Sequence, residues 1–415
     1  MLLNHNSPAP ESRNHWHRLL LIFSVACLIE SAFYGQVGAF TPIYLPKLGL
    51  PLASVPMWTG AIMAISNVIG IPFLPLWGAL ADRYARKPII IRSFIVELMG
   101  IVLMMVSGNI WIFVLGRALL SLSLGNSGLM MTTLSEQAPP NRLGLAFSIM
   151  NGAAPLAAFA GPLVGGLIVD RSGFPMLMGA DGVLIVVVIV MLLVGYRDAF
   201  RVRSEVPVLR MAAESVFIIW RSKRVRMLFG ALLFLCASWM LGFTYVPLAI
   251  TALYKGTHPN SAVGIVMAVG GLMTLLLSPI MGALSDRFGH WKVLIIGAVV
   301  SLVLWPLPAF THNLFMFGAA WAALNGVTSG IFAISFAVMS NSVSDDVRGR
   351  VMSFAYLPFN IGAFLGPAIG SLAIKSNVFA IFHISAILTG MCIAVLLIAR
   401  RQAVDIAPAN TELSR

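Results

Sequence analysis

The chain has 415 residues, of which 59% are hydrophobic and only 10% are charged. A soluble domain carries about 25% charged residues, so this composition excludes a soluble globular protein and indicates a chain that crosses a membrane many times. The net charge of +12 would suit nucleic-acid binding, but the positions of the basic residues favour a different explanation, given below.

Twelve apolar segments are long enough to cross a membrane as helices, which takes about 20 mostly apolar residues. The first six are expected at residues 19–45, 56–80, 88–107, 109–133, 143–168 and 175–195. The second six are expected at residues 227–252, 260–284, 292–310, 312–340, 350–373 and 378–399. We therefore predict an all-α membrane protein with an N-terminal half at 1–195, a cytoplasmic central loop at 196–226 and a C-terminal half at 227–415.

Lysines and arginines between these segments predict the orientation of the chain. With the N-terminus inside, 22 of the 27 basic residues fall in cytoplasmic segments and four fall outside. Both termini are then cytoplasmic. This bias accounts for the net charge, and the same residues would contact anionic lipids, so we do not expect a nucleic-acid partner.

Glu30 lies near the middle of the first segment, in the run CLIESAFYGQ. Ionisable residues inside a membrane are costly and usually functional, and a buried acid can take up and release a proton. A structural carboxylate bonded to a nearby asparagine or arginine is the alternative. Glu97 in the third segment and Asp181 in the sixth are further acids within the membrane.

The loop between the second and third segments is repeated in the second half. Residues 75–87 read PLWGALADRYARK and residues 279–292 read PIMGALSDRFGHWK, which places Asp82 and Asp286 204 residues apart. Gly78 lets a neighbouring helix approach closely, and Asp82 can meet the positive end of a helix. The repeat indicates two related halves and disfavours the alternative of an ordinary basic loop.

Arg117 lies in the fourth segment at a depth of about 12 Å, at 1.5 Å per residue. A buried cation is costly and usually faces a cavity or a partner. A structural arginine bonded to backbone carbonyls is the alternative.

The fifth segment contains NGAAPLAAFAGPLVGG at residues 151–166, and its AFAGPLVG is echoed by AFLGPAIG at residues 363–370. Pro162 removes one backbone hydrogen bond and is expected to kink the helix. The glycines and alanines around it form a smooth face for tight packing against another helix.

Together these features resemble the major facilitator superfamily over the whole chain. GALADRYARK is similar to the family signature Gly-x-x-x-Asp-Arg-x-Gly-Arg-Arg/Lys, although Ala85 replaces a glycine, and His290 and Trp291 replace basic residues in the second copy. The resemblance implies two pseudo-symmetric six-helix halves around a central cavity, a monomer, and a place in the bacterial inner (plasma) membrane.

The resemblance also implies a cytoplasmic latch that stabilises the outward-open state. Asp82 would face the N-terminus of the eleventh helix, and the arginines would pair with an acid at the end of the fourth, where Glu136 stands. The expected latch residues are Gly78, Asp82, Arg83, Arg86, Lys87, Arg92, Glu136, Asp286 and Arg287.

The fifth segment resembles the antiporter signature found mainly in the exporters of this family. The matching residues are Gly152, Gly161, Pro162, Gly165 and Gly166, with Ala157 in place of one glycine. This match implies export by exchange rather than uptake. The family links an arginine at the position of Arg117 to proton coupling, and its exporters often carry an acid in the first helix, where Glu30 lies.

By the same resemblance, helices 1, 2, 4, 5, 7, 8, 10 and 11 line the cavity, whereas Glu97 and Asp181 lie on peripheral helices. A mostly apolar cavity with adaptable methionines suits lipophilic, poorly related substrates. For each candidate cavity residue, ordinary helix packing is the alternative. The candidates are Tyr34, Gln36, Asn67, Asn126, Met130, Asn151, Trp239, Tyr245, Trp321, Asn325, Tyr356, Phe359 and Asn360.

The sequence contains no phosphate-binding loop, metal-site spacing or catalytic triad signature, so we predict neither an enzyme nor a cofactor. The predicted function is export of small amphiphilic compounds, such as drugs, in exchange for protons by alternating access, with the proton gradient as the energy source. One alternative is a dedicated exporter or importer of a single metabolite, such as a sugar, an organic acid or a siderophore. A membrane sensor or an intramembrane enzyme is another.

Overall fold

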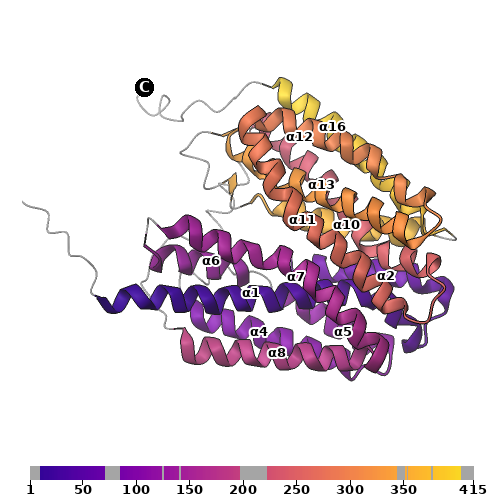
Figure 1. The fold of residues 1–415 in the computed structure, drawn as a ribbon, viewed down its shortest axis with the longest axis horizontal. Coiled ribbons are helices and arrows are strands. Elements are labelled where there is room, and N and C mark those ends of the chain that lie inside the picture. The colour runs from indigo at the N-terminus through magenta and orange to yellow at the C-terminus, as the bar shows by residue number, and fades with distance from the viewer. Residues whose placement is uncertain are drawn as a thin grey trace, which may run out of the picture.

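The computed structural model describes residues 10–70, 85–123, 126–139, 142–196, 222–343, 351–352, 354–374 and 377–402. Regular structure in these ranges is helical, which confirms the predicted all-α class. The N-terminal half contains α1 (Pro10–Tyr44), α2 (Val55–Val68), α4 (Arg86–Met105), α5 (Ile110–Leu120), α6 (Asn126–Gln137), α7 (Leu143–Ser172) and α8 (Phe174–Gly195). The C-terminal half contains α10 (Lys223–Leu253), α11 (Pro259–Phe288), α12 (His290–Leu304), α13 (Leu314–Ser340), α15 (Leu357–Ala373) and α16 (Ala380–Arg401) (Figure 1).

Each of the twelve predicted segments corresponds to helix in the described ranges. Ten stretches are long and apolar enough to span a membrane. The other two predicted segments, the second and the eleventh, correspond to the shorter apolar helices Leu52–Val68 and Leu357–Ala373. In the sequence, each of these helices lies within a few residues of the edge of a described range. The predicted fourth segment is built from α5, the 3-10 turn η4 (Ser121–Ser123) and α6.

Helix boundaries follow local sequence signals. Asn109 Oδ1 accepts hydrogen bonds of 3.0 Å from the backbone N–H groups of Trp111 and Ile112, and so caps the start of α5. Asn313 caps α13 in the same manner. Gly173 and Gly289, with φ of 85° and 94°, make the tight turns that join α7 to α8 and α11 to α12, because this backbone conformation suits glycine best.

The internal repeat is visible in the packing of its glycines. A Cβ atom on Gly161 would lie 3.1 Å from the Ala32 backbone, so α7 packs directly on α1, the first helix of its half. In the second copy, Gly366 approaches the backbone of Ala237 closely, so α15 packs on α10, the first helix of the other half. The echoed AF-x-GP-x-x-G runs therefore perform the same packing task twice.

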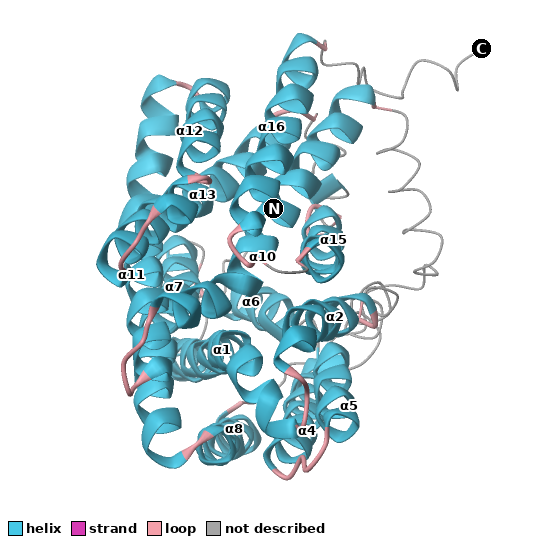
Figure 2. Cartoon of the chain, turned by 90° about the vertical axis from the view of Figure 1, so that its right-hand side faces the viewer, coloured by secondary structure: helices cyan, strands magenta, loops and turns pink. Residues whose placement is uncertain are grey.

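The two halves meet chiefly through α7 with α11 and α2 with α15. Close contacts such as Gly166 with Asn260 and Gly60 with Pro367 lie toward one end of the molecule, where α1, α7 and α10 end and α2, α8 and α11 begin. We call this end the closed end. Toward the opposite end, where α1 and α10 begin, the two halves diverge (Figure 1). On the far side of the N-terminal half from α10–α16, α4 packs beside α8 (Figure 2).

Candidate functional site

Glu30 is buried in α1, on the side of that helix that meets α6. Its Oε1 accepts a hydrogen bond of 3.1 Å from Nδ2 of Asn126, itself buried at the start of α6. The structure therefore brings together two residues that the sequence predicted separately. An amide donor carries no charge, and no described residue forms an ion pair with Glu30, so the described residues hold this group in place without a counter-charge.

Arg117 is buried in α5 and does not form an ion pair with Glu30 in the described part of the chain. Its Nη2 lies 2.9 Å from Sδ of Met63 in α2. Tyr34 connects the two regions, because it interacts electrostatically with both Glu30 and Arg117. The Tyr34 hydroxyl lies 2.8 Å from Oγ of Ser123, which anchors α1 to the 3-10 turn η4 that follows α5.

Glu97 in α4 and Asp181 in α8 point into the N-terminal half, although both helices lie on its outer side. Glu97 is 0% exposed and Asp181 is 4% exposed. Neither oxygen of the Glu97 carboxyl has a hydrogen-bond partner among the described residues. Glu97 interacts electrostatically with Glu30 and with Asp181. The peripheral position of the helices, inferred from the family resemblance, therefore does not describe these side chains.

The predicted antiporter motif holds α7 between α1 and α11. Gly161 and Gly165 face α1, where Nε2 of Gln36 donates a 3.1 Å hydrogen bond to the Gly161 carbonyl. Gly166 faces the other half, and a Cβ there would lie 2.6 Å from the Asn260 carbonyl oxygen. Nothing lies within 4 Å of a Cβ on Gly152. Part of the motif is thus an inter-half contact.

Asp170 joins the two halves at the closed end, and the sequence analysis missed it. It lies in the last turn of α7, and its carboxylate accepts hydrogen bonds from the first turn of α11. Oδ1 accepts from the backbone N–H (3.2 Å) and Nδ2 (2.7 Å) of Asn260, and Oδ2 accepts from the Ser261 N–H (2.7 Å). A carboxylate at a helix N-terminus is stabilised by free N–H groups and by the helix dipole. We call this contact the Asp170 clamp.

The predicted latch is partly visible at the opposite end. Arg86 Nη2 and Glu136 Oε1 form an ion pair of 2.8 Å between α4 and α6. Lys87 donates to the carbonyls of Leu193 (2.7 Å) and Tyr196 (2.6 Å) at the end of α8, and Arg92 donates to the Leu122 carbonyl (3.1 Å). Gly78, Asp82 and Arg83 lie outside the described residues.

The second copy of the latch is looser. Asp286 is 78% exposed and lies 3.8 Å from Nδ1 of His290, which begins α12 after the tight turn at Gly289. The guanidinium of Arg287 lies over the ring of Phe288. Neither contact joins two helices of the bundle through a short ion pair, in contrast to Arg86 and Glu136.

Other predicted cavity residues of the N-terminal half differ in exposure. Met130 is fully buried in the core, and Asn151 is exposed. Asn67 is half-buried, and its Nδ2 donates a hydrogen bond of 2.7 Å to the Met63 carbonyl of its own helix.

In the C-terminal half, Trp239 and Asn325 were predicted to contact substrate, and they bond each other. Trp239 Nε1 donates to Asn325 Oδ1 at 2.9 Å. Asn325 Nδ2 donates to the Gly270 carbonyl and to Thr274 Oγ1, both at 3.0 Å. One amide thus ties α10, α11 and α13 together. Trp321 and Tyr245 are also buried, and the Tyr245 hydroxyl donates a hydrogen bond of 3.1 Å to the Pro367 carbonyl.

We expect Asn325→Ala to destabilise the protein by about 1–3 kcal/mol, because it removes three hydrogen bonds and leaves buried groups without partners. Thermal unfolding of the purified variant, followed by size-exclusion chromatography after heating, measures this. Asn360→Ala is the matched control, since among the described residues the Asn360 side chain bonds to the Tyr356 carbonyl, one turn earlier, and to no other helix. Equal melting temperatures for the two variants would show that the Asn325 hydrogen bonds do not contribute to the stability of the protein.

An aromatic cluster crosses α10, α13 and the start of α15. Its ring centroids lie 5.9 Å apart for Trp239 and Phe332, 5.4 Å for Phe332 and Phe359, and 5.1 Å for Phe336 and Tyr356. Tyr356 is 60% exposed. The sequence analysis missed Phe332 and Phe336, although their spacing of four places both on one face of a helix. Such a surface can stack on flat apolar molecules and attract cations.

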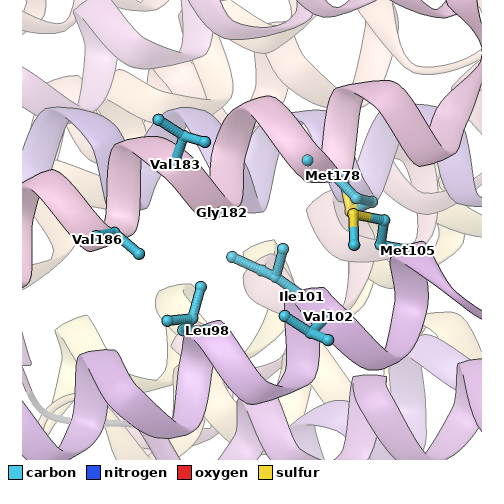
Figure 3. Close-up of a pocket in the computed structure, with 9 residues that line it drawn as sticks. Leu98, Ile101, Val102, Met105, Met178, Gly182, Val183 and Val186 are labelled. Carbon is cyan, nitrogen blue, oxygen red and sulfur yellow. The ribbon is translucent and has the colours of Figure 1, made fainter.

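An apolar groove of about 250 Å³ lies between α4 and α8, and Figure 3 shows the side chains that line it. Its walls include Leu98, Ile101 and Met105 from one helix and Met178 and Val186 from the other. The groove lies apart from Glu30 and the aromatic cluster. No group of His, Cys, Asp and Glu side chains in the described ranges is arranged to hold a metal ion.

Comparisons with known proteins agree over nearly the whole chain. The model of the Major Facilitator Superfamily matches residues 19–258 and 227–414. A relative called multidrug resistance protein MdtG from Citrobacter koseri is 28% identical over 376 residues, which are 90% of this chain and 92% of the relative. The protein of the same name from Escherichia coli is 29% identical over 367 residues, which are 88% and 89% of the two chains.

Solved structures share the fold at low identity. The nucleoside transporter NupG superposes with a TM-score of 0.77 at 13% identity, over 94% of this chain and all of that one. A D-xylose-proton symporter superposes with a TM-score of 0.73 at 15% identity, over 94% and 98%.

Proposed function

This chain belongs to the major facilitator superfamily, and on that premise we propose that it exports small lipophilic compounds, including drugs, across the bacterial inner membrane in exchange for protons. The observation that carries the proposal is Glu30, a carboxyl buried in α1 and held by Asn126, with no positively charged partner among the described residues. Such a group can bind either a proton or a cationic substrate. The names of the MdtG relatives support the multidrug part.

The aromatic cluster supports the choice of substrate class. Trp239, Tyr356 and Phe359 offer ring faces and edges rather than a fixed set of hydrogen-bond donors. A site of this kind binds molecules by stacking and apolar contact, and it discriminates weakly between related shapes. A site for one sugar or nucleoside would need several directed polar groups instead. The likeness to NupG and to the xylose symporter concerns the fold alone.

The orientation derived from basic residues places the closed end outside the cell, so we assign the structure to an inward-open state. In this state Glu30 would release its proton to the cytoplasm and accept substrate. After the halves rock to the outward-open state, a proton from outside would bind Glu30 and displace the substrate. The Asp170 clamp would stabilise the inward-open state, and the contact expected between Asp82 and the eleventh helix of the other half would stabilise the outward-open one.

Inside-out membrane vesicles test the exchange. The vesicles are energised to an acidic interior, a pH-sensitive dye reports the gradient, and a panel of lipophilic cationic and neutral drugs is added. We expect several unrelated drugs to release protons from vesicles that contain the protein and not from empty ones.

Two other outcomes would contradict the proposal in different ways. Proton release with a single metabolite and none of the drugs would assign the protein to the dedicated-transporter alternative. A proton gradient that no compound disturbs would show that the protein does not exchange these compounds for protons.

A further inference from the structure

The N-terminal half buries more acids than the proposed exchange requires. Glu30 accounts for one coupled proton, but Glu97 and Asp181 lie equally deep, on α4 and α8. Both oxygens of Glu97 and Oδ2 of Asp181 lack hydrogen-bond partners in the part of the chain that the structure describes. An ionised carboxylate in such a place would be strongly destabilised, because its desolvation would not be offset by hydrogen bonds.

The charged groups facing Glu97 do not supply a counter-ion for it. The helices packed on α4 carry Asp181 (α8), Arg117 (α5) and Glu136 (α6), and Glu97 also interacts electrostatically with Glu30 and Tyr34 of α1. On α4 itself, the basic residues lie near its start. Arg86 pairs with Glu136, Lys87 caps α8, and Arg92 bonds to Leu122.

Charge balance then fixes the number of protons. Three buried acids share this interior with Arg117, because the other buried arginine, Arg86, forms an ion pair with Glu136. Neutrality requires that two of the three carboxyls carry protons. If Glu30 alone gains or loses a proton, the interior acquires a net charge, which is costly in a medium of low polarity. Because Glu97 interacts electrostatically with both Glu30 and Asp181, a compensating proton movement at Glu97 or Asp181 relieves this cost.

We propose that Glu97 and Asp181 form a second proton-binding site in the N-terminal half, coupled to Glu30, so that protonation of Glu30 promotes proton release from this pair. The site deepens the proposed function by naming a second carrier of protons, but its existence does not depend on drug transport. No covalent bond changes: one proton enters at Glu30 while another leaves the pair. The pair releases its proton to, and regains it from, the same side of the membrane, so each cycle still carries one proton across.

A proton fits this site better than a metal ion or sodium. The described residues contain no group of side chains arranged as metal ligands. The groove between α4 and α8 is lined by apolar side chains such as Leu98, Ile101 and Val183 (Figure 3), so it offers a hydrated cation no polar ligand. A neutral carboxyl is tolerated among such neighbours, and a charged one is not.

The test measures protonated carboxyls directly on the purified full-length protein, without substrate. A hydrophobic carbodiimide reacts with protonated buried carboxyls, and mass spectrometry locates the modified residues. In wild type at neutral pH we expect modification at Glu97 or Asp181. Infrared spectra should show a protonated-carboxyl band that shifts in heavy water and weakens in Glu97→Gln. Asp286→Asn, which removes an exposed acid, should leave the band unchanged.

The coupling is tested by repeating the infrared titration in Glu30→Gln, which fixes that position neutral. We expect the pair to lose a proton at lower pH than in wild type. If Glu97→Gln fails to fold, Asp181→Asn and the wild-type modification map still decide the matter. Ionised Glu97 and Asp181 at neutral pH, unmodified by the carbodiimide, would overturn the inference. Because none of these measurements needs a drug, a failed vesicle assay would remove the proposed function and leave this result standing.

Discussion

Replacing Gly166 by alanine is expected to reduce export by about tenfold or more, whereas Gly152→Ala should export at nearly the wild-type rate. Both glycines belong to the same motif in α7, but the new methyl groups would meet different surroundings. At Gly166 a Cβ would lie 2.6 Å from the carbonyl oxygen of Asn260 in α11, and at Gly152 nothing lies within 4 Å. Backbone cannot move aside as a flexible side chain can, and overpacking of this kind costs about 1–3 kcal/mol.

Drug accumulation in everted vesicles, corrected for the amount of folded protein, measures the two variants. The loss in Gly166→Ala should come from the closed end, because the affected contact joins the two halves there. Gly161→Ala tests the distinction, since its Cβ would strike α1 within the same half and should lower thermal stability first. If Gly152→Ala and Gly166→Ala lose export equally, the motif acts through something other than the inter-half contact.

Asp170→Ala is expected to shift the protein from the inward-open toward the outward-open state by about 5- to 30-fold. The clamp supplies three hydrogen bonds from Asn260 and Ser261 to one carboxylate. Charge-assisted bonds are strong, but this contact is partly exposed, so we discount it to about 1–2 kcal/mol. Because the bonds exist only while the closed end is shut, their loss raises the population of the other state.

Spin labels at Leu52 and Leu372 measure this shift. Both side chains are 78% exposed, and they belong to opposite halves near the closed end, so the distance between labels reports its opening. We expect a larger fraction of long distances in Asp170→Ala than in wild type. Arg171→Ala, which changes the neighbouring exposed residue, is the control and should leave the distribution unchanged. A distribution identical to wild type in Asp170→Ala would show that the clamp does not hold the closed end.

The transmembrane segments could be predicted from the sequence because length and apolarity alone define them. The repeated glycine motif could be predicted as a packing face for the same local reason, and its partners α1 and α10 proved equivalent in the two halves. The Asp170 clamp could not be predicted, since it requires knowing that the end of α7 meets the start of α11, 90 residues later. The sequence marks Asp170 only as an acid at a helix end.

The direction in which side chains point was the second feature that could not be predicted from the sequence. Glu97 and Asp181 lie on outer helices and point inward, which the family resemblance alone could not indicate. Asn325 and Trp239 carry the polar atoms expected of a binding site, but in the structure those atoms form hydrogen bonds between helices. Phe332 and Phe336 look like ordinary apolar residues of α13, and only the approach of α10 and α15 makes them part of the aromatic cluster.

Transport by Glu30→Gln in proteoliposomes tests the central claim most directly, because it separates drug movement from proton coupling. We expect this variant to exchange radiolabelled drug for unlabelled drug across the membrane, since the fold and the aromatic cluster remain. It should fail to accumulate drug against a concentration difference when a proton gradient is imposed, whereas Glu30→Asp, which keeps a carboxyl, should retain part of that ability. Accumulation by Glu30→Gln at the wild-type level would contradict the account, because the coupled proton would then be carried elsewhere.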